Sequence, residues 1–489
     1  MRKNLIFETN KGNKYLHTVD RKYNLFMHPA LESRINNNPI NESLCFGQDK
    51  EYYARKYDFL LHNGFMEKAN ISFLEKPDSN IVKIKLANLR QLVFEVTDNC
   101  NLRCYYCTYG KLYGNYDERK SKKLSFGLAK KVIDYMINLW NSSYNTSFNN
   151  IVDISFYGGE PLMNFELITQ IIYYLESLNI NTLNFSYRMT TNAMLLNKYM
   201  DYLVDKKFNL LISIDGDEYG DSYRVTKSGK SSFKRVYENI LLLKNRYPDY
   251  YDKYVDFNAV LHDRNTYENT FLFIKKHFNK GTKVSELSDN GLLPEKKEEF
   301  ERIFSSTYEE QIKFFNTHKD IAEDNSFKRA EDVQLHSLIH GFIGNKYNSF
   351  NELLKNEDKV VHMPSGTCMA FYKKLFLTVN GKILPCEKIG QEYPLGVASE
   401  DKVDIDFDRI SSIYENMYKP LLKICENCYH QDSCAQCVFL IHDKREGDKF
   451  TCPTFVNKHI MQDYLSRNVS YAEENTFAYE NIVSTDLIY

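Results

Sequence analysis

The stretch CNLRCYYC, residues 100–107, decides which fold and which chemistry this sequence predicts. It places Cys100, Cys104 and Cys107 in a C-x3-C-x2-C spacing directly after the apolar-rich segment 91–97. Three thiolates on one short loop can bind three corners of an iron–sulfur cubane and leave the fourth iron open to a non-protein ligand. Structural zinc sites usually take four ligands with paired cysteine spacing, which this loop lacks. The spacing therefore favours an iron–sulfur site over zinc.

Strands and helices are predicted to alternate on both sides of this loop. The strand candidates are Gln91–Thr97, Ile151–Tyr157, Asn184–Thr190, Leu210–Ile214, Val255–Leu261 and Lys283–Leu287. The helix candidates between them are Phe126–Trp140, Asn164–Leu178, Leu195–Lys206, Ser232–Asn245 and Glu268–Asn279. This order predicts an α/β fold with a parallel sheet, either doubly wound or a partial barrel. Both forms bind ligands at the carboxyl ends of their strands.

The loop and the strand ends together resemble a known family. CNLRCYYC looks like the signature of the radical S-adenosylmethionine (SAM) enzymes, and Gly158-Gly159-Glu160-Pro161 resembles their GGEP segment. Thr191-Asn192 resembles the TNG segment, with Ala193 where glycine is usual. The resemblance covers residues 91–287 and implies a partial (β/α)6 barrel that holds a [4Fe–4S] cluster and SAM.

The resemblance also implies a role for each matching residue. Tyr106 would lie near the adenine of SAM, Glu160 would meet its amino group, and Arg224 would lie near its carboxylate. Ser213, in Ser213-Ile214-Asp215-Gly216, would approach the ribose, although Asn192 and Ser213 are equally compatible with simple capping of strand ends. In such enzymes the cofactors supply the radical chemistry and the protein supplies placement. The predicted SAM-binding residues are Tyr106, Gly158, Gly159, Glu160, Pro161, Asn192, Ser213, Asp215 and Arg224.

A second group of seven cysteines follows between residues 363 and 452. Two C-x2-C pairs within it are typical of zinc ribbons, so without the first loop zinc and iron–sulfur are equally favoured. The pattern resembles the SPASM domain, which carries two auxiliary clusters, although two residues separate Cys434 from Cys437 where the family usually has three. The resemblance assigns Cys368, Cys386 and Cys437 to the first auxiliary cluster, and Cys425, Cys428, Cys434 and Cys452 to the second.

Three further residues have open roles, and one of them, Cys45, lies far from these motifs in the sequence. His362 stands where some relatives have a fourth ligand to the first auxiliary cluster, so that ligand could be His362, a substrate group or nothing. Glu387 directly follows Cys386 and matches the place of a catalytic base in sulfatase-maturing relatives, or is simply a solvated acid. Cys45 is predicted to be a small buried hydrophobic residue.

The first 85 residues lack such motifs and predict a small module. Lys14–Val19 and Tyr23–Met27 predict a β-hairpin, Glu51–Asn63 predicts a helix that ends at Gly64, and a strand or two is expected within Ile71–Leu86. Together they suggest a winged-helix-like shape. Peptide maturases often carry a leader-recognition element at this place; the alternative is an unrelated packing domain.

Composition limits the other possibilities. The chain has 489 residues, with 63 Lys and Arg against 65 Asp and Glu, and this balance argues against nucleic-acid binding. It has no apolar run long enough to span a bilayer and no secretory signal, so we expect a cytoplasmic protein without membrane contact. In that compartment clustered cysteines are more often ligands than disulfides.

The resemblance therefore implies a radical SAM/SPASM peptide maturase. We expect a leader-recognition domain at 1–85, a partial barrel at 86–290, a helical connector at 291–360 and a SPASM domain at 361–489. The enzyme would use SAM, three [4Fe–4S] clusters and an external donor of the flavodoxin or ferredoxin type. Its substrate would be a ribosomally made precursor peptide with a leader, cross-linked through a thioether or carbon–carbon bond. The alternatives are a sulfatase-maturing enzyme that forms formylglycine and a non-enzymatic zinc-ribbon interaction protein.

Overall fold

The computed structural model describes residues 4–19, 22–37, 47–66, 72–74, 76–146, 151–178, 183–318, 330–342, 361–366, 368–431, 434–442 and 451–485. The chain forms two compact units. The first, here called the barrel unit, comprises Pro77–Thr317 and Cys368–Tyr414. The second, here called the terminal unit, comprises Met1–Lys76, His318–Thr367 and Glu415–Tyr489.

The barrel unit is built on six parallel strands that lie side by side in chain order. A doubly wound sheet reverses its strand order at a switch point, whereas a barrel adds each strand to the same side of the last. The unbroken order therefore identifies a partial barrel among the two predicted forms. The strands are β5 (Gln91–Thr97), β6 (Ile151–Gly158), β7 (Asn184–Thr191), β8 (Asn209–Ser213), β9 (Val255–Val260) and β10 (Thr282–Ser285).

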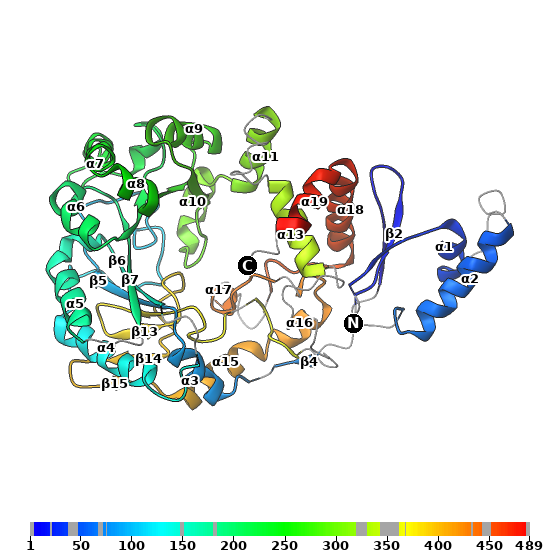
Figure 1. The fold of residues 1–489 in the computed structure, drawn as a ribbon, viewed down its shortest axis with the longest axis horizontal. Helices are drawn as coiled ribbons and strands as arrows, with labels where there is room; N and C mark the ends of the chain where they lie inside the picture. Colours follow the sequence, from blue (N-terminus) through cyan, green and yellow to red (C-terminus); the bar gives the residue numbers. More distant parts are fainter. Residues whose placement is uncertain are drawn as a thin grey trace. The chain divides into compact units, whose positions relative to one another are not determined.

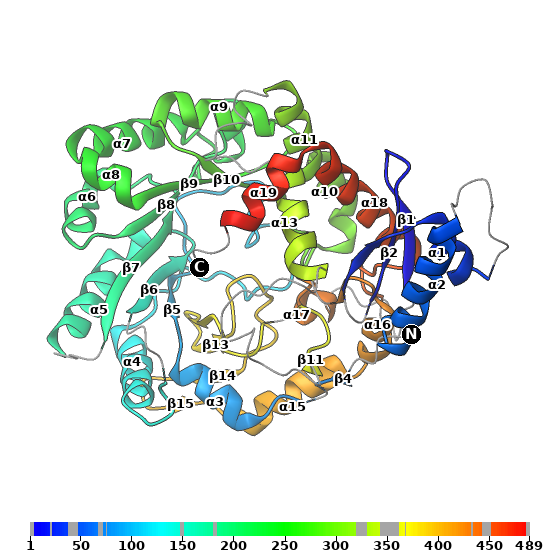
Figure 2. The same ribbon diagram turned by 45° about the vertical axis from the view of Figure 1, so that its right-hand side comes forward.

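Helices lie along the outer side of this curved sheet (Figures 1 and 2). Helix α4 (Phe126–Trp140) begins where the Ser125 side chain accepts a hydrogen bond from Leu128 N, and it buries one apolar face against the sheet. The predicted strands and helices of this region are confirmed, and α8 is an additional helix. The remaining helices are α5 (Phe165–Ser177), α6 (Leu196–Asp205), α7 (Phe233–Arg246), α8 (Pro248–Tyr254) and α9 (Tyr267–Phe278).

A later part of the chain extends the same sheet beyond β5. Strand β12 (Lys374–Leu377) pairs in parallel with β5, and three antiparallel strands follow it. These are β13 (Lys382–Leu384), β14 (Gly396–Ala398) and β15 (Val403–Asp404). Residues 368–414, which the sequence predicts for a C-terminal domain, are thus part of the barrel unit.

The segment Ile71–Leu86, predicted to contain a strand or two, has one short strand among its described residues, β4 (Ser72–Phe73). Its second half was not predicted to be helical, but Ser79–Ala87 is helix α3. The Asp78 side chain accepts hydrogen bonds from Asn80 N and Ile81 N at 2.7 and 3.2 Å and so caps the helix. Burial of Val82 and Leu86, four residues apart, completes a helical rather than an alternating pattern.

The terminal unit contains an N-terminal module of three antiparallel strands and two helices. The predicted hairpin is confirmed as β2 (Lys14–His17) and β3 (Asn24–Phe26), and β1 (Leu5–Glu8) is an additional strand beside β2. Helices α1 (Pro29–Ile35) and α2 (Gly47–His62) follow, and Gly64 after α2 has a positive φ of 71°. Leu16, Met27, Leu31 and Leu60 form the core of this module.

The C-terminal helices of the terminal unit cover the free edge of β1. The side chains of Gln462 and Ser466 on α18 (Lys458–Glu474) donate hydrogen bonds to the carbonyls of Ile6 and Glu8, at 2.6 and 2.5 Å. Two open acceptors of an edge strand are thereby occupied. The unit also contains α13 (Ala330–Phe342), β11 (Val361–His362), α16 (Leu422–Asn427), α17 (Val438–His442) and α19 (Thr476–Thr485).

The predicted helical connector, 291–360, is helical wherever the structure describes it as regular. It contains a short 3-10 turn, Pro294–Lys296, followed by α10 (Lys297–Ile303), α11 (Thr307–Thr317) and α13. Among the described residues, none of the helices is both long and apolar enough to cross a membrane.

Candidate active site

The loop that carries Cys100, Cys104 and Cys107 follows the carboxyl end of β5 and is tied to a neighbouring segment of the barrel. Arg103 N donates to Val225 O at 2.7 Å, and Tyr105 N donates to Tyr223 O at 3.2 Å. The pKa of Cys100 is raised to about 11, mainly by burial, and the charges of Glu160 and Cys107 contribute to the increase. The charges of Cys100 and Cys107 likewise add to the effect of burial on Cys104. The three thiols therefore share one site.

This donor set fits an iron–sulfur cluster. Thiolates are the usual ligands of such clusters, and each thiolate binds a different iron atom. A single metal ion instead needs its ligands to converge on one point. Within the described ranges, no group of three or more His, Cys, Asp and Glu side chains converges in that way.

The glycine pair at the end of β6 lets this strand approach the base of the cysteine loop. A Cβ on Gly158 would lie 2.2 Å from Thr97 O, and one on Gly159 would lie 2.1 Å from Asn99 O. Gly158 also has a positive φ of 134°. The N–H groups of Gly159 and Glu160 donate to the carbonyls of Thr97 and Asn99, both at 2.9 Å. The two glycines thus allow the backbone of β6 to lie close against the backbone at the start of the cysteine loop.

Glu160 is buried beside this contact and joins two strand ends. Its Oε1 accepts from Thr191 Oγ1 at 2.7 Å and from Leu162 N at 3.1 Å, which begins the turn Pro161–Asn164. Its Oε2 accepts from Asn192 N at 2.8 Å. Burial raises the pKa of Glu160 to about 7, against the lowering effect of these three hydrogen bonds.

Asn192 reaches from the end of β7 to the cysteine loop. Its Nδ2 lies 2.7 Å from Asn101 Oδ1 and 3.7 Å from the sulfur of Cys100. Ala193, where the family has glycine, adopts a left-handed conformation with φ 59°, which explains why glycine is favoured at this position. Ser213, at the end of β8, donates its hydroxyl to Asn258 Oδ1 at 3.0 Å.

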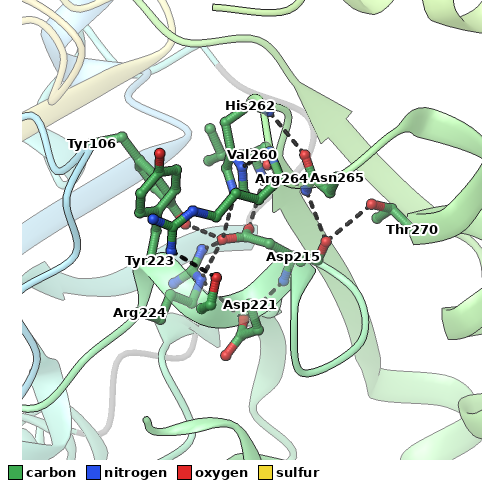
Figure 3. A network of polar contacts seen from close by, with 12 residues as sticks. Tyr106, Asp215, Asp221, Tyr223, Arg224, Val260, His262, Arg264, Asn265 and Thr270 are labelled. Atoms are coloured by element: carbon green, nitrogen blue, oxygen red, sulfur yellow. Dashed lines mark hydrogen bonds and ion pairs between the residues drawn. The ribbon is translucent and has the colours of Figure 1, made fainter. Parts of the chain in front are cut away.

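Asp215 is the centre of a buried polar network (Figure 3). Its carboxylate forms two hydrogen bonds with Arg224, with Nε–Oδ2 and Nη2–Oδ1 distances of 2.9 and 3.1 Å. The hydroxyl of Tyr106 donates to the same carboxylate. Although burial favours the neutral acid, the Arg224 charge and these hydrogen bonds hold the pKa of Asp215 below its usual range. Arg224 is thereby neutralised within the protein.

Two members of the network were not predicted from the sequence. Burial raises the pKa of Asp221, whose Oδ1 lies 3.5 Å from Arg224 Nε. His262, fully buried after β9, stacks on the Tyr106 ring with a centroid distance of 5.4 Å. The only sequence signals were an acid three residues before Arg224 and a histidine just after a predicted strand. Neither has a fixed spacing to the cysteine loop.

A cavity of about 220 Å³ lies against the inner side of the sheet. Residues of all six parallel strands line it, together with Lys374 and Glu387. The Lys374 ammonium lies 2.8 and 3.0 Å from the two carboxylate oxygens of Glu387, so Glu387 is ion-paired rather than an isolated solvated acid. Lys374 was not predicted as a site residue, because it starts a strand whose pairing with β5 has no local sequence signal.

Tyr157, near the carboxyl end of β6, lines the same cavity. Burial raises the pKa of its phenol far above the usual range. The charges of Glu387, Cys107 and Cys386 raise it further, so the phenol lies close to both cysteine segments of the barrel unit. No cysteine and no predicted SAM-binding residue is among the described residues that line the cavity.

Four cysteines of the second group come together within the terminal unit. The pKa of Cys425 is raised to about 12, mainly by burial, and the charges of Cys434, Cys428 and Cys452 contribute to the increase. Gly366 packs directly on this group, since a Cβ there would lie 1.7 Å from Cys434 O. The four residues are those that the resemblance assigns to one auxiliary cluster.

The other predicted ligands are divided between the two units. Cys368 is exposed and Cys386 partly buried in the barrel unit, whereas Cys437 belongs to the terminal unit. None of the ten cysteines that the structure describes forms a disulfide. The side chain of His362 and the whole of Cys45 lie outside the described residues.

The fold and the cysteine loop define a class of protein. Residues 94–274 match the model of the Radical SAM superfamily, so this part of the chain is a radical SAM domain, as its motifs predicted. Enzymes of this family use a [4Fe–4S] cluster and SAM.

Three relatives share parts of this sequence. The chain is 36% identical over 158 residues to the uncharacterized protein MJ0907 of Methanocaldococcus jannaschii, which covers 32% of this chain and 49% of that protein. It is 24% identical over 365 residues to the radical SAM cyclopropyl synthase TigE of Paramaledivibacter caminithermalis, 73% of this chain and 68% of that one. It is 30% identical over 165 residues to a cysteine-type anaerobic sulfatase-maturating enzyme of Clostridium novyi, 33% of this chain and 42% of that one. The chain thus spans half or less of two of these relatives.

A solved structure shares the fold. Native anSMEcpe with bound AdoMet and the Kp18Cys peptide has a TM-score of 0.53 and 15% identity, and covers 81% of this chain and 98% of that chain.

Proposed function

We propose that this protein is a radical SAM peptide maturase that forms a cross-link, through a thioether or a carbon–carbon bond, in a ribosomally made precursor. One observation carries the proposal. A cavity within the barrel unit is lined by the ion pair Lys374–Glu387, beside Cys386, and by Tyr157, whose phenol is affected by the charges of both Cys107 and Cys386. This cavity would hold part of the substrate peptide.

The first cysteine loop would hold the cluster to which SAM binds. Cys100, Cys104 and Cys107 supply three thiolates, and the bound cofactors supply a 5′-deoxyadenosyl radical. Asn192 and Glu160 hold the strand ends beside Cys100, and Ser213 keeps hydroxyl lone pairs for a further partner. These residues orient the cofactors and do no covalent chemistry themselves.

The remaining cysteines would hold two auxiliary clusters. Cys425, Cys428, Cys434 and Cys452 supply a complete set of four thiolates for one of them. Cys368, Cys386 and Cys437 would hold the other, with its fourth ligand left to the substrate or to His362. Either cluster could accept the electron that bond closure releases, and an external flavodoxin or ferredoxin would supply the electron that starts the reaction.

The N-terminal module would bind the leader of the precursor. Its edge strand β1 is covered by α18, whereas β3 forms the other edge of the three-stranded sheet. An extended leader can add to such an edge through main-chain hydrogen bonds, and neighbouring pockets then select its side chains. Phe26 on β3 is 52% exposed and offers an apolar contact beside that edge.

Mass spectrometry of a co-expressed peptide tests the proposal. A small precursor encoded beside this chain would be expressed with it anaerobically and analysed intact and by fragmentation. We expect a loss of paired hydrogens and a segment in which fragmentation is silenced. A Cys104→Ala variant of the enzyme is the control and should leave the peptide unchanged. An unmodified peptide from a preparation that cleaves SAM would contradict the proposal for that peptide.

A sulfatase-maturing activity is the second candidate. It is favoured by the relative from Clostridium novyi and by Glu387, which directly follows Cys386 and faces the cavity. The test is incubation with a peptide that carries a sulfatase-type cysteine or serine, followed by a search for an aldehyde at that residue. An aldehyde that forms with wild-type enzyme and not with Glu387→Gln would support this candidate over cross-linking.

A further inference from the structure

We infer that Asp215 is a positioning residue that holds the cysteine loop through Tyr106, and that it does not itself contact SAM. The inference rests on one part of the proposed function, namely that the loop of residues 100–107 carries an iron–sulfur cluster. It differs from the role that the resemblance implies, in which Asp215 belongs to the SAM-binding residues.

The backbone of Asp215 is fully engaged within the protein. Its N–H donates to Asp221 Oδ1 at 3.1 Å. Its carbonyl accepts from Asn265 Nδ2 at 2.8 Å and from Thr270 Oγ1 at 3.0 Å. The residue therefore has one fixed backbone position after β8.

The carboxylate of Asp215 is equally engaged. Oδ1 accepts from Val260 N at 2.9 Å and from Arg224 Nη2 at 3.1 Å. Oδ2 accepts from Arg224 Nε at 2.9 Å and from the Tyr106 hydroxyl. A carboxylate offers about four lone-pair sites, and all of them are used. Since the residue has 0% exposure, no site is left for a hydroxyl or amine of a ligand.

Only one of these partners belongs to the cysteine loop. Tyr106 lies between Cys104 and Cys107, so its hydroxyl connects the middle of the loop to the strand ends behind it. The Tyr106 ring is stacked on His262 and lies 5.6 Å from the Arg224 guanidinium. The Nδ1 of His262 accepts from Arg264 N at 3.2 Å, which assigns the proton to Nε2; this atom lies 3.8 Å from Asp215 Oδ2, beyond hydrogen-bond distance.

The neighbouring tyrosine provides a matched comparison. Tyr105 also donates its hydroxyl to a carboxylate, that of Glu299. Glu299 is partly exposed and also pairs with Lys296 at 2.8 Å. A hydrogen bond to a charged group is weaker where water competes for that group than where the pair is buried. Of the two tyrosine–carboxylate contacts, the one with Asp215 is therefore expected to hold the loop.

The test measures iron release from the holoenzyme to a chelator, under anaerobic conditions and without SAM. The phase that belongs to the loop is the one missing in Cys104→Ala. We expect Tyr106→Phe and Asp215→Asn each to speed this phase by about tenfold, the ratio that corresponds to one charge-assisted hydrogen bond. The double variant should be no faster than the faster single variant, and Tyr105→Phe should match wild type.

A second readout separates positioning from a direct contact. The electron paramagnetic resonance spectrum of the reduced loop cluster, recorded without SAM, should change in both Tyr106→Phe and Asp215→Asn. A residue that only contacts SAM would leave iron release and this spectrum unchanged and would only weaken SAM binding. That result, or additive effects in the double variant, would overturn the inference. Tyr106→Phe leaves the Asp215–Arg224 pair intact, so it remains informative if Asp215→Asn folds poorly. No peptide is needed, so the test is independent of whether cross-linking occurs.

Discussion

The two cysteine sites are supported in opposite ways. The loop of residues 100–107 is bound to β5, to residues 223–226 and to the glycine pair at the end of β6. The four cysteines of the terminal unit instead come from short turns and helices, among them α16, which has six residues and buries none of them. The first site is thus held by hydrogen bonds to barrel strands, whereas the second is held by a few hydrogen bonds between turns, such as Gly366 N to Gln436 O at 2.9 Å. We therefore expect the second site to depend more strongly on a bound group.

Removal of iron should produce the largest difference in stability between the two cysteine sites. A metal site built from short turns contributes its binding free energy to folding, on the order of several kcal/mol. We expect the iron-free chain to lose hydrogen-exchange protection in residues 422–431 and 434–442 and to keep it in β5 and β6. Equal loss of protection in both regions would contradict the comparison. Cys428→Ala should reproduce the change in the terminal unit, and Cys104→Ala should not.

Replacement of the buried Arg224 should destabilise the polar network that holds the loop of residues 100–107. Arg224→Met leaves the carboxylate of Asp215 buried without its cation, which typically costs about 3–5 kcal/mol. The measurement is thermal unfolding of the iron-free chain. The double variant Arg224→Met/Asp215→Asn should recover part of the loss, because it buries no unpaired charge. A single variant that unfolds like wild type would show that the network carries little stability.

Glu95 provides a pH-dependent probe beneath the same loop. Burial raises its pKa from 4.5 to about 7, although Val379 N and the Tyr109 hydroxyl donate hydrogen bonds to it. The folded state therefore holds the proton more tightly than the unfolded state. The contribution of Glu95 is fully present below pH 4.5 and is lost as the pH rises to about 7. At about 1.4 kcal/mol per pH unit, the loss is roughly 3 kcal/mol.

The measurement for Glu95 is the difference in thermal stability between wild type and Glu95→Gln from pH 5 to pH 8. Wild type should become less stable relative to the variant as the pH rises through this window. Asp401→Asn, an exposed acid of the barrel unit, is the control and should show no such trend. A difference that does not change with pH would mean that Glu95 ionises normally.

A methyl group at the glycine pair tests the close approach of β6. In Gly159→Ala, the added Cβ would lie 2.1 Å from Asn99 O and 2.9 Å from Cys100 N, both backbone atoms. The loop must shift, at a cost of about 1–3 kcal/mol, and loop iron should be released faster. Gly229→Ala is the control, because its φ of +83° is unfavourable but nothing lies within 4 Å of the added atom. Its iron release should be that of wild type.

The comparison also shows what the sequence could predict. Strands β5 to β9 are apolar segments between turn signals, and α4 begins at a serine cap, so local patterns were sufficient there. Helix α3 was missed because its Ile-Val-Lys-Ile-Lys-Leu run also fits a strand, and only the Asp78 cap and packing decide. The pairing of β12 with β5 joins residues almost three hundred positions apart, and no local pattern encodes it.

The residues of the candidate site also fall into two groups, those that local sequence predicts and those that it does not. The cysteines and the glycine pair were recognised because their chemistry and their steric demands are local. The hydrogen bonds that occupy Asp215 were not predicted from the sequence. Those from Val260, Asn265 and Thr270 form only when β8, β9 and α9 come together. A motif therefore identified which residues matter near the cofactor, while the contacts determine which of them can still reach it.

The smallest expected effect concerns Ala193, where the family has glycine. Ala193→Gly relieves a left-handed residue of about 1–2 kcal/mol of strain. It also removes a fully buried methyl group and loosens the unfolded chain, which together cost about as much. We therefore expect a change in unfolding free energy below about 1 kcal/mol. Lys207→Gly is the matched control: Lys207 has a φ of 51° after α6 and is exposed, so no buried methyl group is lost. The relieved strain is offset only by the looser unfolded chain, so this variant should be at least as stable as wild type. A loss above about 2 kcal/mol for Ala193→Gly would show that its methyl group, rather than its backbone, holds the end of β7 beside the cysteine loop.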